Sequence, residues 1–215
     1  MSPDPEVGPG LRADPDVLLG YPPNREVDGP LVLGRDAHLR SGTVLYDGSS
    51  IGARFESGHH VIVREQCRIG DDVSVWSGTV IDYGASIGNR VKIHANCYVA
   101  QFTEIGDGAF LAPGVTIAND LYPGNDASGR VMSGPSIGPG AQLGVNVTVL
   151  PFVRIGAGAL VGAGATVTRD LPDGCVAYGN PAVVRGTVDG LPGIGTRVES
   201  VPGSASRYRL ARERP

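Results

Sequence analysis

The sequence predicts an all-β fold, a left-handed parallel β-helix of about seven 18-residue coils with one protruding loop. Two periods and the composition support this prediction. An aliphatic residue recurs at every sixth position over most of the chain, and a glycine recurs at every eighteenth. Aromatic residues make up only 6% of the chain, whereas there are 33 glycines and 17 prolines. Such a composition favours many tight corners over helices.

The six-residue period starts at Leu33 and ends at Val167, and Ser57 is its one member that is not aliphatic. Neither the helical period of 3.6 nor the strand period of 2.0 explains it. Short strands separated by corners do, if each aliphatic side chain points inward. The series is Leu33, Leu39, Leu45, Ile51, Ser57, Val63, Ile69, Val75, Ile81, Ile87, Ile93, Val99, Ile105, Leu111 and Ile117, then Ile137, Leu143, Val149, Ile155, Val161 and Val167.

The 18-residue period indicates that three such units close one triangular coil. The residue after every third aliphatic position is glycine, namely Gly34, Gly52, Gly70, Gly88, Gly106, Gly138 and Gly156. The predicted coils are 33–50, 51–68, 69–86, 87–104, 105–122, 137–154 and 155–172. Stacked at the strand spacing of ~4.8 Å, they would form a prism roughly 34 Å long. Its stability would be close to a sum over neighbouring coils.

The interruption and the ends of the pattern give the domain organisation. We expect an extended N-terminal segment at 1–30, the β-helix at 31–172 with a loop at 123–136, and a C-terminal extension at 173–215. Glycines resume in phase after the loop, so the helix continues beneath it. A loop of this length in a compact repeat favours a functional role. Cys67 and Cys97 fall at inward positions, which predicts core thiols rather than ligands.

Charge and composition limit the kinds of binding partner and the cellular location that we expect. The formal net charge of −4 gives no reason to expect nucleic acid or an anionic membrane surface. No apolar run approaches the ~18 residues of a membrane-spanning helix, and no signal peptide is visible. Three widely spaced cysteines make a disulfide framework improbable, and we expect a cytoplasmic protein.

Polar residues interrupt the repeat on one face. His59 and His60 lie on the middle face of the second coil, His94 lies two coils further, and Trp76 shares a column with His94. His60 and Asn96 share another column. A histidine there would suit a general base, because its pKa is near ~6.5. Zinc would need three converging imidazoles, a set that these positions do not supply, so no metal is expected. His38 alone would be an ordinary surface residue.

The runs IHANCYVAQFTEIGDGAFLAPGVTIANDLYP and GAGATVTRD, followed by GNPA, resemble bacterial hexapeptide-repeat acyltransferases, especially the branch that N-acetylates nucleotide-linked amino sugars. The resemblance covers about residues 33–186 and implies a homotrimer with acetyl-CoA between neighbouring prisms. It places the cofactor near Val145, Ala163, Thr168, Arg169 and Arg185. It places the acceptor near Asn119, Asp120 and Tyr122 at the start of the loop.

The resemblance, taken with these residues, implies an acetyl-CoA-dependent N-acetyltransferase. The candidate catalytic residues are His60, His94 and Asn96, and the candidate substrate-binding residues are His59, Trp76, Asn119, Asp120 and Tyr122. The amine would attack the thioester directly, with the proton passing to a histidine or to the departing thiolate. Two alternatives remain open. One is the same donor with another acceptor, such as an amino acid, a sugar hydroxyl or a secondary-metabolite amine. The other is a metalloprotein resembling γ-class carbonic anhydrase, although Val99 stands where that class has a histidine.

Overall fold

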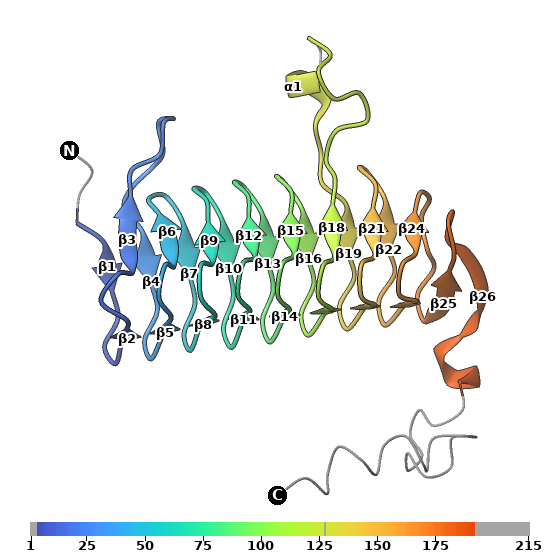
Figure 1. The fold of residues 1–215 in the computed structure, drawn as a ribbon, viewed down its shortest axis with the longest axis horizontal. Helices are drawn as coiled ribbons and strands as arrows, with labels where there is room; N and C mark the ends of the chain where they lie inside the picture. Colours follow the sequence, from blue (N-terminus) through green and yellow to red (C-terminus); the bar gives the residue numbers. More distant parts are fainter. Residues whose placement is uncertain (1–3, 127, 192–215) are drawn as a thin grey trace, which may run out of the picture.

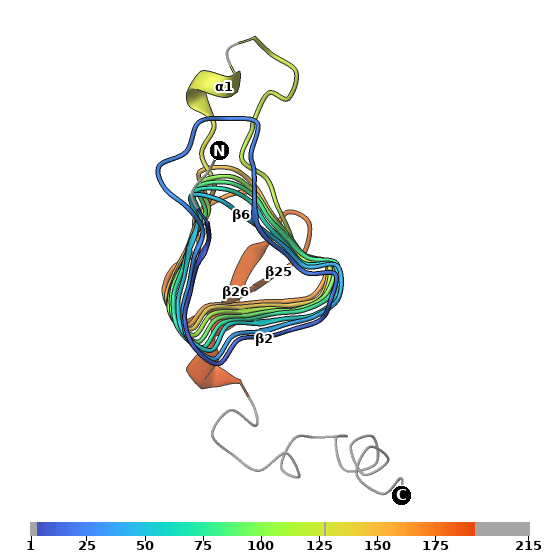
Figure 2. The ribbon, with the colours of Figure 1, turned by 90° about the vertical axis from the view of Figure 1, so that its left-hand side faces the viewer.

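The computed structural model describes residues 4–126 and 128–191. The chain winds into a three-sided prism of parallel strands, most of them only two residues long (Figure 1). Viewed along the axis, successive coils superimpose as one triangle (Figure 2). The predicted left-handed parallel β-helix and its all-β class are confirmed.

Each side of the prism is one sheet, whose successive strands come from successive coils. Sheet A contains β1 (Glu6–Val7), β4 (Val32–Leu33), β7 (Ser50–Ile51), β10 (Arg68–Ile69), β13 (Ser86–Ile87), β16 (Glu104–Ile105), β19 (Ser136–Ile137) and β22 (Arg154–Ile155). Sheet B contains β2 (Arg12–Ala13), β5 (His38–Leu39), β8 (Glu56–Ser57), β11 (Ser74–Val75), β14 (Lys92–Ile93), β17 (Phe110–Leu111), β20 (Gln142–Leu143), β23 (Leu160–Val161), β25 (Cys175–Tyr178) and β26 (Val183–Thr187). Sheet C contains β3 (Leu18–Tyr21), β6 (Val44–Tyr46), β9 (Ile62–Val63), β12 (Val80–Ile81), β15 (Tyr98–Val99), β18 (Thr116–Ile117), β21 (Thr148–Val149) and β24 (Thr166–Val167). We name the corners A–B, B–C and C–A after the sheets that they join.

The core consists of the residues of the six-residue period, aligned from coil to coil. In sheet A, Ile51 pairs with Ile69 and Ile69 with Ile87, and none of the three is more than 5% exposed. The polar exception, Ser57, is also buried. Its hydroxyl lies 2.8 Å from the Thr43 hydroxyl and accepts a hydrogen bond from the backbone of Arg40. A buried hydroxyl with partners costs little, so the repeat tolerates it.

The glycines of the 18-residue period lie at the A–B corner, where neighbouring coils approach too closely for a side chain. A Cβ added to Gly34 would lie 2.5 Å from the carbonyl carbon of Gly52. That distance is well inside ordinary van der Waals contact, so only glycine fits without moving the backbone. The sterics of coil stacking therefore explain the second period.

The structure adds one coil to the seven predicted, because residues 6–21 form β1, β2 and β3 rather than an isolated extended segment. In this coil Val7 pairs with Leu33 and Leu19 with Leu45. The signal was present: Val7, Ala13 and Leu19 are six residues apart, and Gly8 continues the glycine column. The segment that leaves the prism after β3 hid the period.

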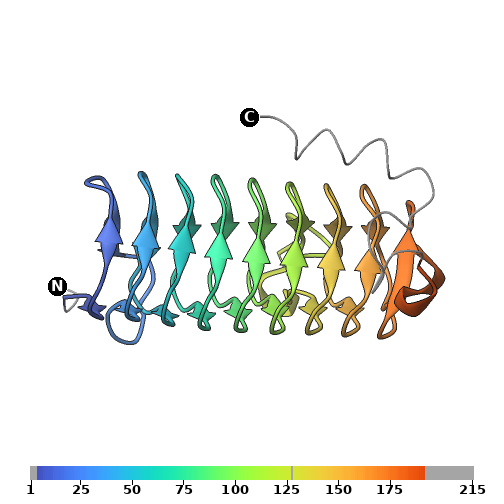
Figure 3. The same cartoon turned by 90° about the horizontal axis from the view of Figure 1, so that it is seen from below.

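Strands lie side by side along the whole axis when the prism is seen from below (Figure 3). Two segments leave it, one between β3 and β4 and one between β18 and β19, and both depart from the C–A corner. The second matches the predicted loop and carries the short helix α1 (Ser128–Val131).

After β24, strand β25 adds to sheet B parallel to β23, and β26 runs back antiparallel to it. The short 3₁₀ helix η1 (Val188–Gly190) follows. This hairpin covers the last coil, and the arginine-rich tail lies outside the described residues. In the described part of the chain, no helix has the length and apolar character needed to cross a membrane.

Candidate functional site

Sheet B and the adjoining B–C corner carry most of the predicted site residues, in an order set by the 18-residue repeat. Arg40, Gly58, Trp76 and His94 occupy the same outward position in four successive coils. His59 lies on the corner beside Gly58, and Val145 and Ala163 hold the position of His59 in later coils. The candidate acceptor residues and two candidate coenzyme residues therefore lie in one line along the prism. We call this line, which contains His59, Trp76, His94, Val145 and Ala163, the B–C strip.

His94 is held in a stack of three rings. Its ring centroid lies 4.3 Å from that of Trp76, with 16° between the planes, and 4.9 Å from that of Phe110. His94 is half-buried and Trp76 is 38% exposed. The predicted shared column of Trp76 and His94 is confirmed. Stacking between two aromatic rings limits the rotamers of His94, which suits a group that must meet a reacting atom at a fixed place.

His60 and Asn96 have a different environment. Both have a positive φ, 56° and 57°, and fill the corner position that Gly42 and Gly78 fill in other coils. The ring of His60 lies against Gly42, where an added Cβ would be 2.2 Å from its Nδ1 atom. Asn96 lies over Gly78 in the same way. Corner geometry accounts for both residues, so their catalytic role remains a prediction without a geometric argument of its own.

Of the residues predicted to bind the cofactor, two lie on the B–C strip and three do not. Val145 is 44% exposed, Ala163 is exposed, and the carbonyl of Val145 accepts a hydrogen bond from the backbone of Gly164 one coil away. Thr168 and Arg169 follow β24 at the other edge of sheet C, and both are exposed. Arg185 lies in β26, with its guanidinium 5.7 Å from the ring of Tyr178.

The residues at the start of the loop lie at the C–A corner, away from the B–C strip of the same chain. The side-chain amide of Asn119 donates to the side-chain oxygen of Gln101 and lies 3.2 Å from the sulfur of Met132 in the loop. Asp120 accepts a hydrogen bond of 2.8 Å from the backbone of Tyr122, which closes a turn. The Tyr122 side chain is 68% exposed. Within one chain, the predicted acceptor residues therefore form two separate groups, one on the B–C strip and one at the C–A corner.

Asp82 anchors Asn119 indirectly. Its Oδ2 atom accepts hydrogen bonds of 2.7 Å from the Tyr98 hydroxyl and from the amide of Gln101, while its Oδ1 lies 3.6 Å from Arg64. Burial and the bond to Asp82 raise the pKa of Tyr98 to about 12, so the phenol stays protonated and donates. Gln101 then presents its oxygen to Asn119. The repeat carried a signal here, because Gln101 and Asn119 are 18 residues apart.

Glu65 links this network to the first protruding segment. Its carboxylate, fully buried, accepts a bidentate pair of hydrogen bonds from Arg64 and forms a 2.7 Å ion pair with Arg25. Arg25 also covers the ring of Tyr83 at 3.6 Å. Burial raises the pKa of Glu65, but the hydrogen bonds from Arg64 and the charge of Arg25 outweigh it, so the pKa lies below its ordinary value. Both protruding segments are therefore tied to one polar network at the C–A corner.

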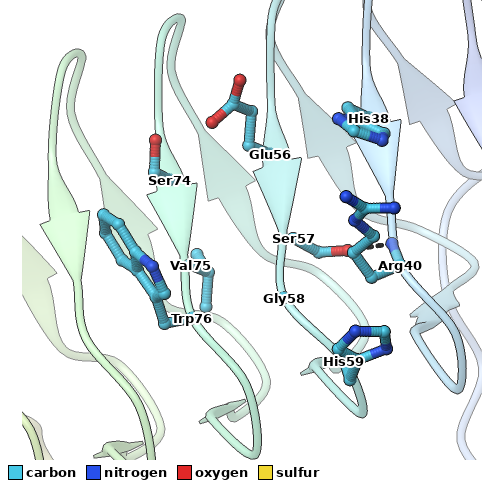
Figure 4. A pocket seen from close by; sticks show the side chains of 9 residues that line it. All are labelled: His38, Arg40, Glu56, Ser57, Gly58, His59, Ser74, Val75 and Trp76. Atoms are coloured by element: carbon cyan, nitrogen blue, oxygen red, sulfur yellow. Dashed lines mark hydrogen bonds between the residues drawn. The ribbon is translucent and has the colours of Figure 1, made fainter. Parts of the chain in front are cut away.

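A pocket of about 280 Å³ opens on sheet B over the first three predicted coils (Figure 4). It includes His59 and Trp76, which were predicted, and residues that were not. Its lining consists of His38, Arg40, Glu56, Ser57, Gly58, His59, Ser74, Val75 and Trp76. His38 is thus half-buried in a pocket wall rather than simply solvated. The sequence contained a signal for this pocket, because Arg40, Gly58 and Trp76 are spaced 18 residues apart and so fall in one column.

The cysteines take no part in the site. Cys67 and Cys97 are buried in the core, as predicted. Burial raises the pKa of the Cys67 thiol to about 12, so the reactive thiolate is scarce near neutral pH. Among residues 4–126 and 128–191, no group of three histidine, cysteine or carboxylate side chains is arranged to hold a metal ion.

Family models match the repeat. The bacterial transferase hexapeptide model matches residues 84–119 and 134–169, and a hexapeptide repeat of succinyl-transferase matches residues 61–101. The chain carries the hexapeptide repeat of bacterial transferases over these residues. The predicted resemblance to hexapeptide-repeat acyltransferases is confirmed, and the branch that N-acetylates nucleotide-linked amino sugars stays a prediction. No curated protein sequence matches the chain.

Several solved structures are similar to the chain. PerB from Caulobacter crescentus, in complex with CoA and GDP-perosamine, is 26% identical over 67% of this chain, with a TM-score of 0.32. The chain spans 57% of the length of that protein. The UDP-N-acetylglucosamine O-acyltransferase of Moraxella catarrhalis is 15% identical, covering 86% of this chain and 73% of its own, with a TM-score of 0.47.

Proposed function

We propose that this hexapeptide-repeat protein transfers an acetyl group from acetyl-CoA to the amine of a nucleotide-linked amino sugar. The B–C strip carries this proposal, because the positions assigned to acceptor and donor follow one another along it. Trp76 and Val145 lie three coils apart, roughly 14 Å at the strand spacing. An acceptor beside Trp76 and His94 and a thioester arriving from Val145 and Ala163 would therefore meet near His94.

The chemistry needs an amine held against a carbonyl carbon. The amine nitrogen attacks the carbonyl carbon of the thioester, the new N–C bond forms as the C–S bond breaks, and the amine proton passes to a protein base or to the departing thiolate. His94 is the candidate base, because it lies on the B–C strip and its ring is held by stacking. Small residues such as Ala163 would let pantetheine approach the corner backbone, and Thr168, Arg169 and Arg185 would face its nucleotide end.

The loop residues join the site through a neighbouring subunit in this proposal. Asn119, Asp120 and Tyr122 leave from the C–A corner, so a second copy is needed to bring them to the B–C strip. We therefore propose a homotrimer, in which the loop of one protomer covers the strip of the next. Three free, buried cysteines support a reducing cytoplasm as its location.

Thiol release from acetyl-CoA, measured with a panel of nucleotide-linked 3- and 4-amino sugars, tests the function. Turnover with at least one of them is expected. Turnover confined to amino acids or sugar hydroxyls would instead favour the other-acceptor alternative. Mixing an inactive His94→Ala protein with an inactive Tyr122→Ala protein tests the shared site, since mixed trimers would regain part of the activity. Monomeric behaviour in light scattering would contradict the intersubunit site.

A further inference from the structure

A gap in the outward column of sheet B gives the pocket its shape. Arg40, Gly58 and Trp76 are successive members of this column, and the middle one has no side chain (Figure 4). Arg40 and Trp76 are therefore two strand spacings apart, about 9.6 Å. A flat ring in contact with both would need about 7–8 Å, two contacts of ~3.5–4 Å. The gap accommodates one such ring and not two.

The walls of the gap have complementary chemistry. One face of the Trp76 indole is taken by His94, so the remaining face is the one toward the gap. The Arg40 guanidinium on the other side would lie over a bound ring as a cation–π partner. Its backbone is fixed by the 3.0 Å hydrogen bond to Ser57, and its side chain is 49% exposed and 4.0 Å from the Asp14 carboxylate.

Polar side chains along the rim of the gap can form hydrogen bonds with the edge of a bound ring. His38, Glu56 and Ser74 stand along one side and His59 on the other. The exposed Glu56 carboxylate only accepts hydrogen bonds, so it favours a ring that bears N–H groups and disfavours a phosphate at the same place. A bare anion is therefore a poor occupant, whereas a nitrogen heterocycle satisfies both the walls and the rim.

We propose that the space between Trp76 and Arg40 is a slot for a nucleobase, and that its occupant is the base of the nucleotide-linked acceptor. The acceptor part of this proposal rests on the proposed function. The volume of about 280 Å³ lies just below the range of whole-ligand sites, ~300–1,000 Å³, so the slot takes a ring rather than a whole nucleotide sugar.

Two substrates could supply a base, and position favours the acceptor. The adenine of CoA belongs to the end of the coenzyme that is expected near Thr168, Arg169 and Arg185, beyond the sixth predicted coil. The slot lies over the first three predicted coils, at the opposite end of the B–C strip. An acceptor with its base in the slot would extend its sugar along the strip toward His94.

Trp76 is the only tryptophan of the chain, so its fluorescence reports occupation of the slot directly. We would titrate the intact protein with UDP, GDP and dTDP, with 3′,5′-ADP as the matching fragment of CoA, and with ribose 5-phosphate and pyrophosphate as ligands without a base. Saturable quenching by at least one nucleoside diphosphate is expected. Equal binding of ribose 5-phosphate or pyrophosphate would overturn the proposal, and response to 3′,5′-ADP alone would overturn the acceptor assignment.

Variants then test the walls by calorimetry, which needs no tryptophan. Arg40→Ala and Trp76→Ala should each weaken nucleotide binding about tenfold, while Arg68→Ala, a change of equal charge on sheet A, should leave it unchanged. Equal weakening by Arg68→Ala would show mere charge attraction and overturn the slot. A single cooperative thermal transition confirms that each variant folds, and for Trp76→Ala a modest fall in melting temperature is expected from the lost contact with His94.

The two proposals fail in different ways. Quenching by nucleotides, without thiol release from acetyl-CoA in the presence of any nucleotide-linked amino sugar, would reject the amino-sugar N-acetyltransferase and keep the slot. Acetylation of free and nucleotide-linked amino sugars at equal kcat/KM, with no quenching, would keep the transferase and reject the slot.

Discussion

Replacement of His94 separates two roles that the structure gives to one ring. His94→Ala removes the candidate base and also the ring between Trp76 and Phe110. Two aromatic contacts at ~0.5–1.5 kcal/mol each give a loss of about 1–3 kcal/mol in the free energy of unfolding. For a chain of this size, the melting temperature would fall by roughly 2–12 °C. His94→Phe keeps a ring in the stack and removes the proton acceptor alone.

The two variants should therefore agree in catalysis and differ in stability. Loss of a general base lowers kcat by about 10²–10⁴-fold, and we expect this from both. Thermal unfolding and steady-state thiol release measure the two effects. Full kcat in His94→Phe would refute the role as base and leave the departing thiolate as proton acceptor. Equal melting temperatures of the alanine and phenylalanine variants would refute the argument from stacking.

Three further predictions concern other parts of the prism. Leu111→Ala, at a fully buried core position, should lower the free energy of unfolding by about 2–5 kcal/mol in denaturant titration, and a smaller loss would show that the coils collapse around the cavity. Glu65→Gln should destabilise the protein at neutral pH. The pKa of Glu65 in the folded protein lies below its ordinary value of 4.5, so the stability that this carboxylate contributes is complete above pH 4.5 and is lost as the pH falls through the folded pKa. The free energies of unfolding of wild type and variant should therefore converge in acid. A difference that stays constant with pH would contradict this. Ala163→Phe should raise the KM for acetyl-CoA at least about tenfold with little change in melting temperature, and an unchanged KM would remove Ala163 from the coenzyme groove.

The fold was predictable in detail because stacking imposes residue types that recur at exact intervals. Glycine at Gly34 follows from backbone contact with the next coil, and inward aliphatic residues such as Ile69 follow from the closed core. The first coil was missed because the segment before Val32 shifts the register, although Val7 and Gly8 carry the same pattern.

The site was less predictable, because outward side chains are not constrained by the repeat. Columns could be assigned, so the contact of Trp76 with His94 followed from spacing. The corner role of His60 was missed, although its column also holds Gly42, Gly78 and Asn96, residue types that are frequent in the left-handed region. In the network from Asp82 to Asn119, only the step from Gln101 to Asn119 follows the 18-residue period, whereas the bonds to Asp82 depend on rotamers and on burial at the C–A corner.

Both protruding segments leave the prism at the C–A corner, and the coils above and below remain in register. Each coil is closed by its own strands, so the length and content of a segment at this corner do not alter the ladder beneath it. Under the proposed function, such an arrangement would let acceptor preference evolve by exchange of one loop while the groove for the acyl donor is inherited unchanged. Grafting residues 121–135 from this chain onto another prism of the same repeat would then test whether the loop acts as a separable module.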